Sequence, residues 1–84
     1  MSKKEKLIKR LLSRPKDFTF DELVTLMGHL GFWMDTSGKT SGSRVKFINR
    51  NDDALWLHKP HPNNILKPYQ IKDSIANLTG KGLL

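Results

Sequence analysis

The sequence predicts an α+β domain in which a three-stranded antiparallel sheet carries helices packed on one face. In three segments apolar residues recur at spacings typical of amphipathic helices. In two neighbouring segments they alternate with polar residues around a turn-forming stretch, which is typical of a β-hairpin. Because the strand-like segments are grouped between helical ones, an antiparallel sheet with its helices on one side is favoured.

The first predicted helix covers residues 3–13. Leu7, Ile8, Leu11 and Leu12 share one helical face, and lysines and arginines occupy the remainder, where a solvated surface is the simpler interpretation. Pro15 ends the helix, because the residue before a proline is pushed out of the α region.

The second helix begins after Thr19, which forms a capping-box pattern with Glu22. Phe18 and Leu23 stand at the two positions of a hydrophobic staple, and Gly31 has the position of the glycine that follows a helix end. A short first strand over residues 32–34 follows that glycine.

A polar loop over residues 36–42 leads to the hairpin, whose strands are predicted over residues 43–48 and 54–58. Residues 49–53 between them are turn-forming types. Pro68 suits the first position of a last helix, which Gly80 closes. Its apolar stripe consists of Tyr69, Ile71, Ile75 and Leu78.

Alternation along the hairpin separates two faces of the sheet. One face holds apolar residues that belong beneath the helices: Val45, Phe47, Leu55 and Leu57. A register that pairs Val45 with Leu57 also sets Arg44 opposite His58 and Lys46 opposite Trp56, with Cβ atoms about 4.5–5.5 Å apart. The open face therefore combines cations, an indole and an imidazole.

Composition limits the classes of function. The 84 residues are enough for one domain, spanning residues 1–84, with a small core and a shallow surface site. There is no cysteine, and no apolar run approaches the length of a membrane span, so we expect a cytoplasmic protein with no membrane partner. The net charge of +7 favours a polyanionic partner.

Basic residues beside an aromatic ring suit single-stranded RNA, because phosphates meet the charges and a base stacks on the ring. Arg44, Lys46 and Trp56 are the candidate contacts, joined by Lys59 and His61 in the stiff segment that follows the second hairpin strand. The alternative is structural: Trp56 and Lys46 form a cross-strand cation–π pair that covers the sheet.

His58 is the candidate catalytic residue, since histidine can move protons near neutral pH while Arg44 stabilises charge on a phosphate. The alternative is a strand-end histidine that is hydrogen-bonded locally. We expect His29 to be structural or solvent-facing. His58 and His61 have no obvious third ligand nearby, so we expect no metal site and no cofactor.

The chain resembles the HicA toxin family. The resemblance rests on a helix ending in Gly31-Phe32, a short strand, a polar loop, the motif GSRVKF over residues 42–47, and Leu66-Lys67-Pro68 before the last helix. It covers roughly residues 20–79, so residues 1–15 form an added N-terminal helix. It implies a double-stranded-RNA-binding-domain-like fold, metal-independent cleavage of mRNA and neutralisation by a HicB-type antitoxin.

Arg44 departs from the family pattern, because the residue after Gly-Ser in the family is the catalytic histidine. Arginine stays protonated and cannot be a general base at neutral pH. His58 on the adjacent strand can take over proton transfer with Arg44 on the phosphate. The protein can also bind RNA without cutting it, or keep a residual electrostatic activity. An antitoxin-binding interaction domain is a further alternative.

Overall fold

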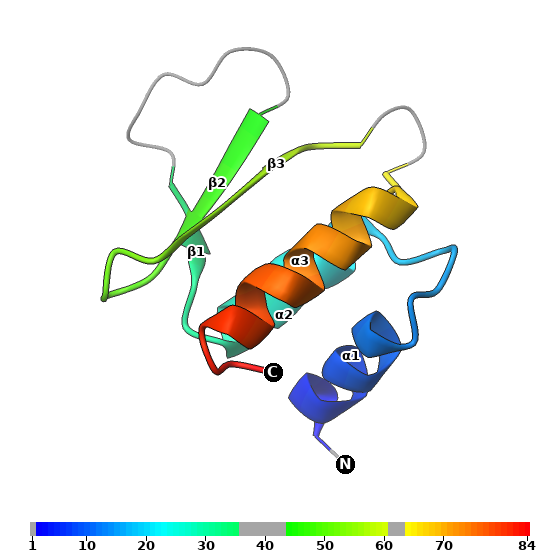
Figure 1. The fold of residues 1–84 in the computed structure, drawn as a ribbon, viewed down its shortest axis with the longest axis horizontal. Coiled ribbons are helices and arrows are strands. Elements are labelled where there is room, and N and C mark those ends of the chain that lie inside the picture. The colour runs from blue at the N-terminus through cyan, green and yellow to red at the C-terminus, as the bar shows by residue number, and fades with distance from the viewer. Residues whose placement is uncertain (1, 36–43, 61–63) are drawn as a thin grey trace.

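The computed structural model describes residues 2–35, 44–60 and 64–84 and has the predicted α+β class (Figure 1). In chain order the elements are α1 (Lys3–Leu12), α2 (Phe20–His29), β1 (Trp33–Met34), β2 (Arg44–Ile48), β3 (Ala54–His58) and α3 (Pro68–Gly80). Helix α2 packs beside β1 and α3 beside β3, while α1 packs on α2 and α3 and lies farthest from the sheet in Figure 1. The predicted loop over residues 36–42 and the start of the second strand at Ser43 lie outside the described residues.

Helix α2 begins and ends as its sequence predicts. The Thr19 hydroxyl accepts a hydrogen bond from the Glu22 backbone N–H at 3.1 Å, and the Glu22 carboxylate accepts one from the Thr19 N–H at 3.1 Å. The capping box is therefore confirmed. Beyond the helix, Gly31 has a φ of +87°, which glycine adopts without the steric cost of a side chain, and the chain turns there into β1.

The ends of the other helices are predicted less completely. Arg14, just before Pro15, leaves the helical region with a φ of 52°. Pro68 is the first residue of α3, as predicted. Gly80, however, is still helical, and the left-handed glycine that follows the helix is Gly82, with a φ of +73°. The assignment of Tyr69 to the apolar stripe is wrong, because 55% of its surface is exposed.

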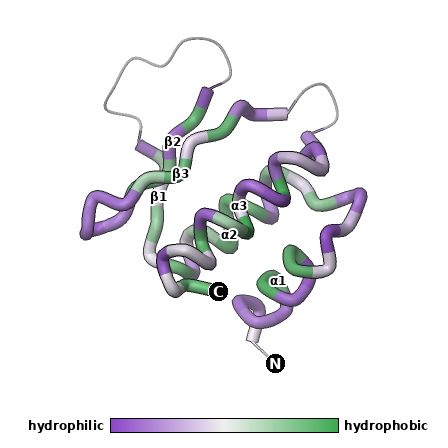
Figure 2. The backbone as a smooth tube through the Cα atoms, in the orientation of Figure 1, coloured by the Kyte–Doolittle hydropathy of each residue, from purple (hydrophilic) through white to green (hydrophobic). Residues whose placement is uncertain are grey.

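The sheet has the order β1-β2-β3 and is antiparallel throughout. Its register is the predicted one: Val45 pairs with Leu57, so Arg44 pairs with His58 and Lys46 with Trp56. Between β2 and β3 the chain turns through a hydrophilic segment, which is purple in Figure 2. Asn49 holds this turn, since its side-chain oxygen accepts hydrogen bonds from the N–H groups of Asn51 and Asp53.

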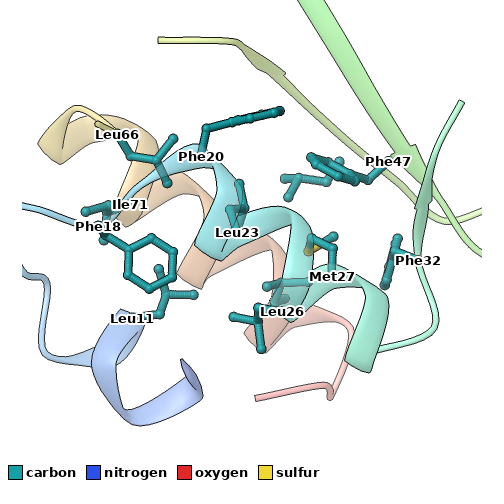
Figure 3. Close-up of a cluster of buried hydrophobic side chains, with 12 residues drawn as sticks. Leu11, Phe18, Phe20, Leu23, Leu26, Met27, Phe32, Phe47, Leu66 and Ile71 are labelled. Atoms are coloured by element: carbon teal, nitrogen blue, oxygen red, sulfur yellow. The ribbon is translucent and has the colours of Figure 1, made fainter. Parts of the chain in front are cut away.

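The core lies between the helices and one face of the sheet (Figure 3). Phe47 of β2 and Phe20 of α2 have ring centroids 6.2 Å apart, and Leu55 of β3 is buried with them. Val45 and Leu57 pack partly buried against the cluster. The remaining buried apolar residues come from all three helices and the segments next to them: Leu11, Phe18, Leu23, Leu26, Met27, Phe32, Leu66, Ile71 and Leu78.

Candidate nucleic-acid interface

The opposite face of β2 and β3 is not covered by helices. Because side chains alternate along a strand, burial of Phe47 and Leu55 turns their neighbours in sequence to the other side. Arg44, Trp56 and His58 are exposed, and Lys46 is half-buried. We call these four residues the open face. They are the cations, the indole and the imidazole that the sequence predicts at one place.

Both cations of the open face lie against the same ring. The Arg44 guanidinium carbon is 4.5 Å from the centroid of the Trp56 ring, and the Lys46 Nζ is 5.0 Å from it. Such cation–π contacts hold long side chains in place while their charges stay accessible to solvent. Trp56 still exposes 47% of its surface beside these two cations.

The two cations differ in how their charge is balanced. Lys46 Nζ lies 3.9 Å from a carboxylate oxygen of Asp35, a residue just after β1. Arg44 forms no ion pair with a carboxylate in the part of the chain that the structure describes. An unbalanced guanidinium at the surface is suited to bind a phosphate, because its planar set of donors matches two phosphate oxygens.

His58 stands at the end of β3, where its backbone is anchored to α3. The side-chain nitrogen of Gln70 donates to the His58 carbonyl at 2.7 Å, and the Gln70 side-chain oxygen accepts from the Lys67 N–H at 3.0 Å. Gln70 is buried. The local hydrogen bond therefore involves the His58 backbone, and the imidazole itself forms none with the described residues. No described residue therefore occupies its ring nitrogens.

Gln70 was not predicted from the sequence, although its position carries a recognisable pattern. A glutamine three residues after the residue that precedes a helix can accept from that residue's N–H, which is half of a capping box. The pairing with the His58 carbonyl has no such local signature.

One predicted contact, Lys59, does not join the open face. The Lys59 Nζ lies 5.7 Å from the centroid of the Phe20 ring, on the side of the sheet that carries the helices. His61 lies outside the described residues. Among residues 2–35, 44–60 and 64–84, no three histidine, aspartate or glutamate side chains come close enough to hold a metal ion.

Trp33 of β1 was missed by the sequence analysis as a residue of this side of the sheet. It pairs with Ile48, which alternates with buried Phe47, and 48% of its surface is exposed. A strand of two residues is too short for alternation to reveal which way its side chains point.

One protein-family model matches the chain over residues 20–78, and its description is "HicA toxin of bacterial toxin-antitoxin". The chain belongs to the HicA toxin family. The match covers α2, the whole sheet and most of α3, and it begins after α1. No curated protein sequence and no solved structure matches the chain.

HicA membership implies a toxin of a toxin–antitoxin system, and toxins of this family are generally ribonucleases. It therefore implies RNA as substrate and an antitoxin as partner. None of the helices in the described part of the chain is both long and apolar enough to cross a membrane.

Proposed function

We propose that this HicA-family chain cleaves mRNA on the open face of its sheet, with His58 as general acid and base and with Arg44 and Lys46 on the phosphate. The observation that carries the proposal is the register of β2 and β3, which sets Arg44 beside His58 and Lys46 beside Trp56 on the uncovered side. Proton transfer and charge stabilisation are thereby available within one pair of neighbouring strands.

The reaction needs no group beyond these side chains. The imidazole of His58 accepts the proton of the ribose 2′-hydroxyl, whose oxygen attacks the adjacent phosphorus. A bond forms between the 2′-oxygen and phosphorus, and the bond to the 5′-oxygen breaks. The protonated imidazole returns the proton to the leaving 5′-oxygen, giving a 2′,3′-cyclic phosphate and a 5′-hydroxyl end.

Arg44 and Lys46 act on the phosphate. The negative charge on the non-bridging oxygens grows as the phosphorus becomes five-coordinate, and fixed cations stabilise that charge more than the ground state. Arg44 occupies the position of the family's histidine and remains protonated, so its role is electrostatic. In this proposal the proton-transfer group has moved from β2 to the directly paired position on β3.

The proposal extends to the organisation of the chain. We propose that residues 20–79 form the HicA-like core and that residues 1–15 are an addition, and a family match over residues 20–78 supports this division. A HicB-type antitoxin neutralises the toxin by covering the open face. RNA and antitoxin then exclude each other.

The test is cleavage of a single-stranded RNA by the purified protein in the presence of a metal chelator. We expect cleavage to persist and His58→Ala to reduce its rate about 100- to 10,000-fold, the usual contribution of a positioned acid or base. His29→Ala is the matched control, because His29 is an exposed histidine of α2 outside the open face. Full activity of His58→Ala would remove His58 from the mechanism.

A non-catalytic RNA-binding module is the second candidate. It is favoured by Arg44 at the family's histidine position and by the placement of both cations against the Trp56 ring, an arrangement that suits binding without proton transfer. This candidate predicts salt-sensitive RNA binding and no cleavage products on a gel. Products bearing cyclic phosphate ends, lost in His58→Ala, would exclude it.

A protein-interaction domain that meets only an antitoxin is the third candidate. It predicts that RNA neither binds nor competes with the partner. Mutual exclusion of RNA and antitoxin, abolished by Arg44→Ala on the RNA side, would contradict it.

A further inference from the structure

Trp33 lies on the same side of the sheet as the open face but is not one of its four residues. It pairs with Ile48, whose neighbour Phe47 points into the core, and Phe32 before it is buried. The ion pair between Lys46 and Asp35 gives independent support, because Asp35 is two residues after Trp33 and reaches an open-face side chain. Alternation then places Trp33 on that side as well.

Two half-exposed indoles therefore flank the central strand. Trp33 exposes 48% of its surface on β1 and Trp56 exposes 47% on β3. Exposing two large aromatic rings on one face of a small domain costs free energy, because apolar surface is more stable when buried. Such exposed apolar surface is typical of a binding site.

The spacing of the two rings follows from the register. Trp33 stands opposite Ile48 and Trp56 opposite Lys46, so they are two strands and two residues apart. With strands about 4.8 Å apart and a rise of about 3.4 Å per residue, their backbone positions are separated by roughly 12 Å. Neighbouring nucleotides of a stacked strand advance by only about 3.4 Å. Bases on the two rings are therefore not stacked on each other and come from an unstacked strand.

Each of the two tryptophan rings has at least one cation nearby. Arg44 and Lys46 lie against Trp56. Arg50, in the turn after β2, lines a surface hollow of about 500 Å³ with Trp33 and with residues at the end of α2 and just after it: Gly28, Leu30, Gly31 and Phe32. The polar side chains of Asn49 and Asn51 line the same hollow. A strand that crosses the sheet from β3 to β1 meets a positive charge near each ring, as single-stranded nucleic acid sites require.

We infer that Trp33 is a second base-stacking position, so that the substrate is single-stranded RNA laid across all three strands with one base on Trp56 and another on Trp33. The inference rests on the proposed function and deepens it by adding Trp33 as a contact and by extending the RNA site to β1. A duplex does not fit, because its bases are stacked inside the helix and cannot reach the rings.

The chain is suited to a direct test, because Trp33 and Trp56 are its two tryptophans. In Trp56→Phe the indole fluorescence reports on Trp33, and in Trp33→Phe it reports on Trp56. The ligand is an eight-nucleotide single-stranded RNA with 2′-O-methyl groups, which cannot be cleaved by attack of the 2′-oxygen. An abasic oligomer of the same length carries the same phosphates and no rings to stack.

We expect the octanucleotide to quench both single-indole proteins and the abasic oligomer to quench neither. Trp33→Leu should weaken binding of the octanucleotide roughly 5- to 150-fold, the fold-change that corresponds to loss of one stacked base. Trp33→Phe keeps a ring and should bind nearly as the wild type does. Met34→Ala is the matched control, because Met34 is an exposed neighbour in β1 that pairs with Phe47 and points to the other side.

Failure of the inference and failure of the proposed function give different results. Suppose that the octanucleotide binds and quenches the fluorescence of Trp56 but not that of Trp33, and that Trp33→Leu binds it as tightly as the wild type does. The second stacking position is then wrong, and the RNA site on the open face stands. If the octanucleotide binds to neither protein, the proposed function fails and takes the inference with it. Shielding of Trp33 by the antitoxin but not by RNA would assign Trp33 to the protein partner and overturn the inference.

Discussion

The two faces of the β2–β3 hairpin are made of alternate residues of the same ten positions, yet their environments have little in common. On the helix side, Phe47 and Leu55 are buried, and Phe47 lies against the aromatic ring of Phe20. On the open side, Arg44 and Lys46 lie on a half-exposed indole. Core residues and residues of the proposed RNA site therefore stand one position apart along each strand, and a register shift by one residue would exchange the two faces.

Phe47→Ala should have the largest effect on stability of any substitution in the two faces of the hairpin. Removal of a buried phenylalanine should cost about 3–5 kcal/mol of unfolding free energy, through lost burial and the cavity that remains. The measurement is urea denaturation. Lys46→Ala, its neighbour on the open face, is the control and should cost less than about 1 kcal/mol, because it loses one partly exposed ion pair and one cation–π contact. Equal costs for the two variants would contradict the assignment of the faces.

Gln70→Ala tests the hydrogen bonds that connect the end of β3 to the start of α3. The substitution leaves the Lys67 N–H and the His58 carbonyl without their side-chain partner, which should cost about 1–3 kcal/mol of stability. It should also slow RNA cleavage at saturating substrate, because the end of β3 that carries His58 is no longer anchored to α3. Lys72→Ala, an exposed change in the same helix, should alter neither quantity. Unchanged cleavage by Gln70→Ala would show that this anchor does not position His58.

The loss of folding stability at acid pH should come from the ion pair between Arg10 of α1 and Glu22 of α2, and not from the open face. The Arg10 guanidinium donates to the Glu22 carboxylate at 2.6 Å and holds the pKa of Glu22 below its ordinary value. Because the folded pKa is lowered, the stabilisation is fully present above the unfolded pKa of about 4.3 and is lost as the pH falls through the folded pKa.

Glu22→Gln should remove this pH dependence. Glutamine can still accept from the Thr19 N–H in the capping box, so the loss near neutral pH should be about 1 kcal/mol for a partly exposed pair. The measurement is the unfolding free energy between pH 3 and pH 7, with Asp52→Asn, an exposed turn carboxylate, as control. An acid transition unchanged by Glu22→Gln would assign the effect to other carboxylates.

The smallest expected effect on stability is that of Arg44→Ala, which should change the unfolding free energy by less than about 0.5 kcal/mol as a surface substitution. RNA affinity should nevertheless fall, and the slope of log K against log salt should flatten by about 1 if Arg44 contacts a phosphate. Lys16→Ala, an exposed cation in the segment between α1 and α2, should leave the slope unchanged. Equal slopes of log K against log salt for Arg44→Ala and Lys16→Ala would show that Arg44 contributes only to the overall charge of the protein and contacts no phosphate.

Most of the fold could be predicted because its signals are local. The capping box fixes the start of α2, and the glycine with positive φ marks its end. Alternation along β2 and β3 and the turn between them allow a pairing of Val45 with Leu57, and the observed register confirms it. The grouping of Arg44, Lys46, Trp56 and His58 follows from that register.

The remaining features depend on contacts that no local pattern records. Gln70 reaches the His58 carbonyl twelve residues earlier, and Trp33 lies in a strand too short to show alternation. Tyr69 has the spacing of a core residue but lies in the first turn of α3, where its ring stays exposed. Lys59 is an exception, because alternation continued one residue past the end of β3 does place it on the helix side, where its ammonium is found.

The most direct test of His58 as the proton-transfer group exchanges the two residues of its cross-strand pair with Arg44. His58→Arg should abolish RNA cleavage, and adding Arg44→His in the same chain should restore it, because the imidazole and the guanidinium again face each other across β2 and β3 with their positions reversed. The measurement is the cleavage rate of a single-stranded RNA under chelating conditions. Wild-type activity in His58→Arg, together with an inactive double variant, would contradict the role of His58 in proton transfer.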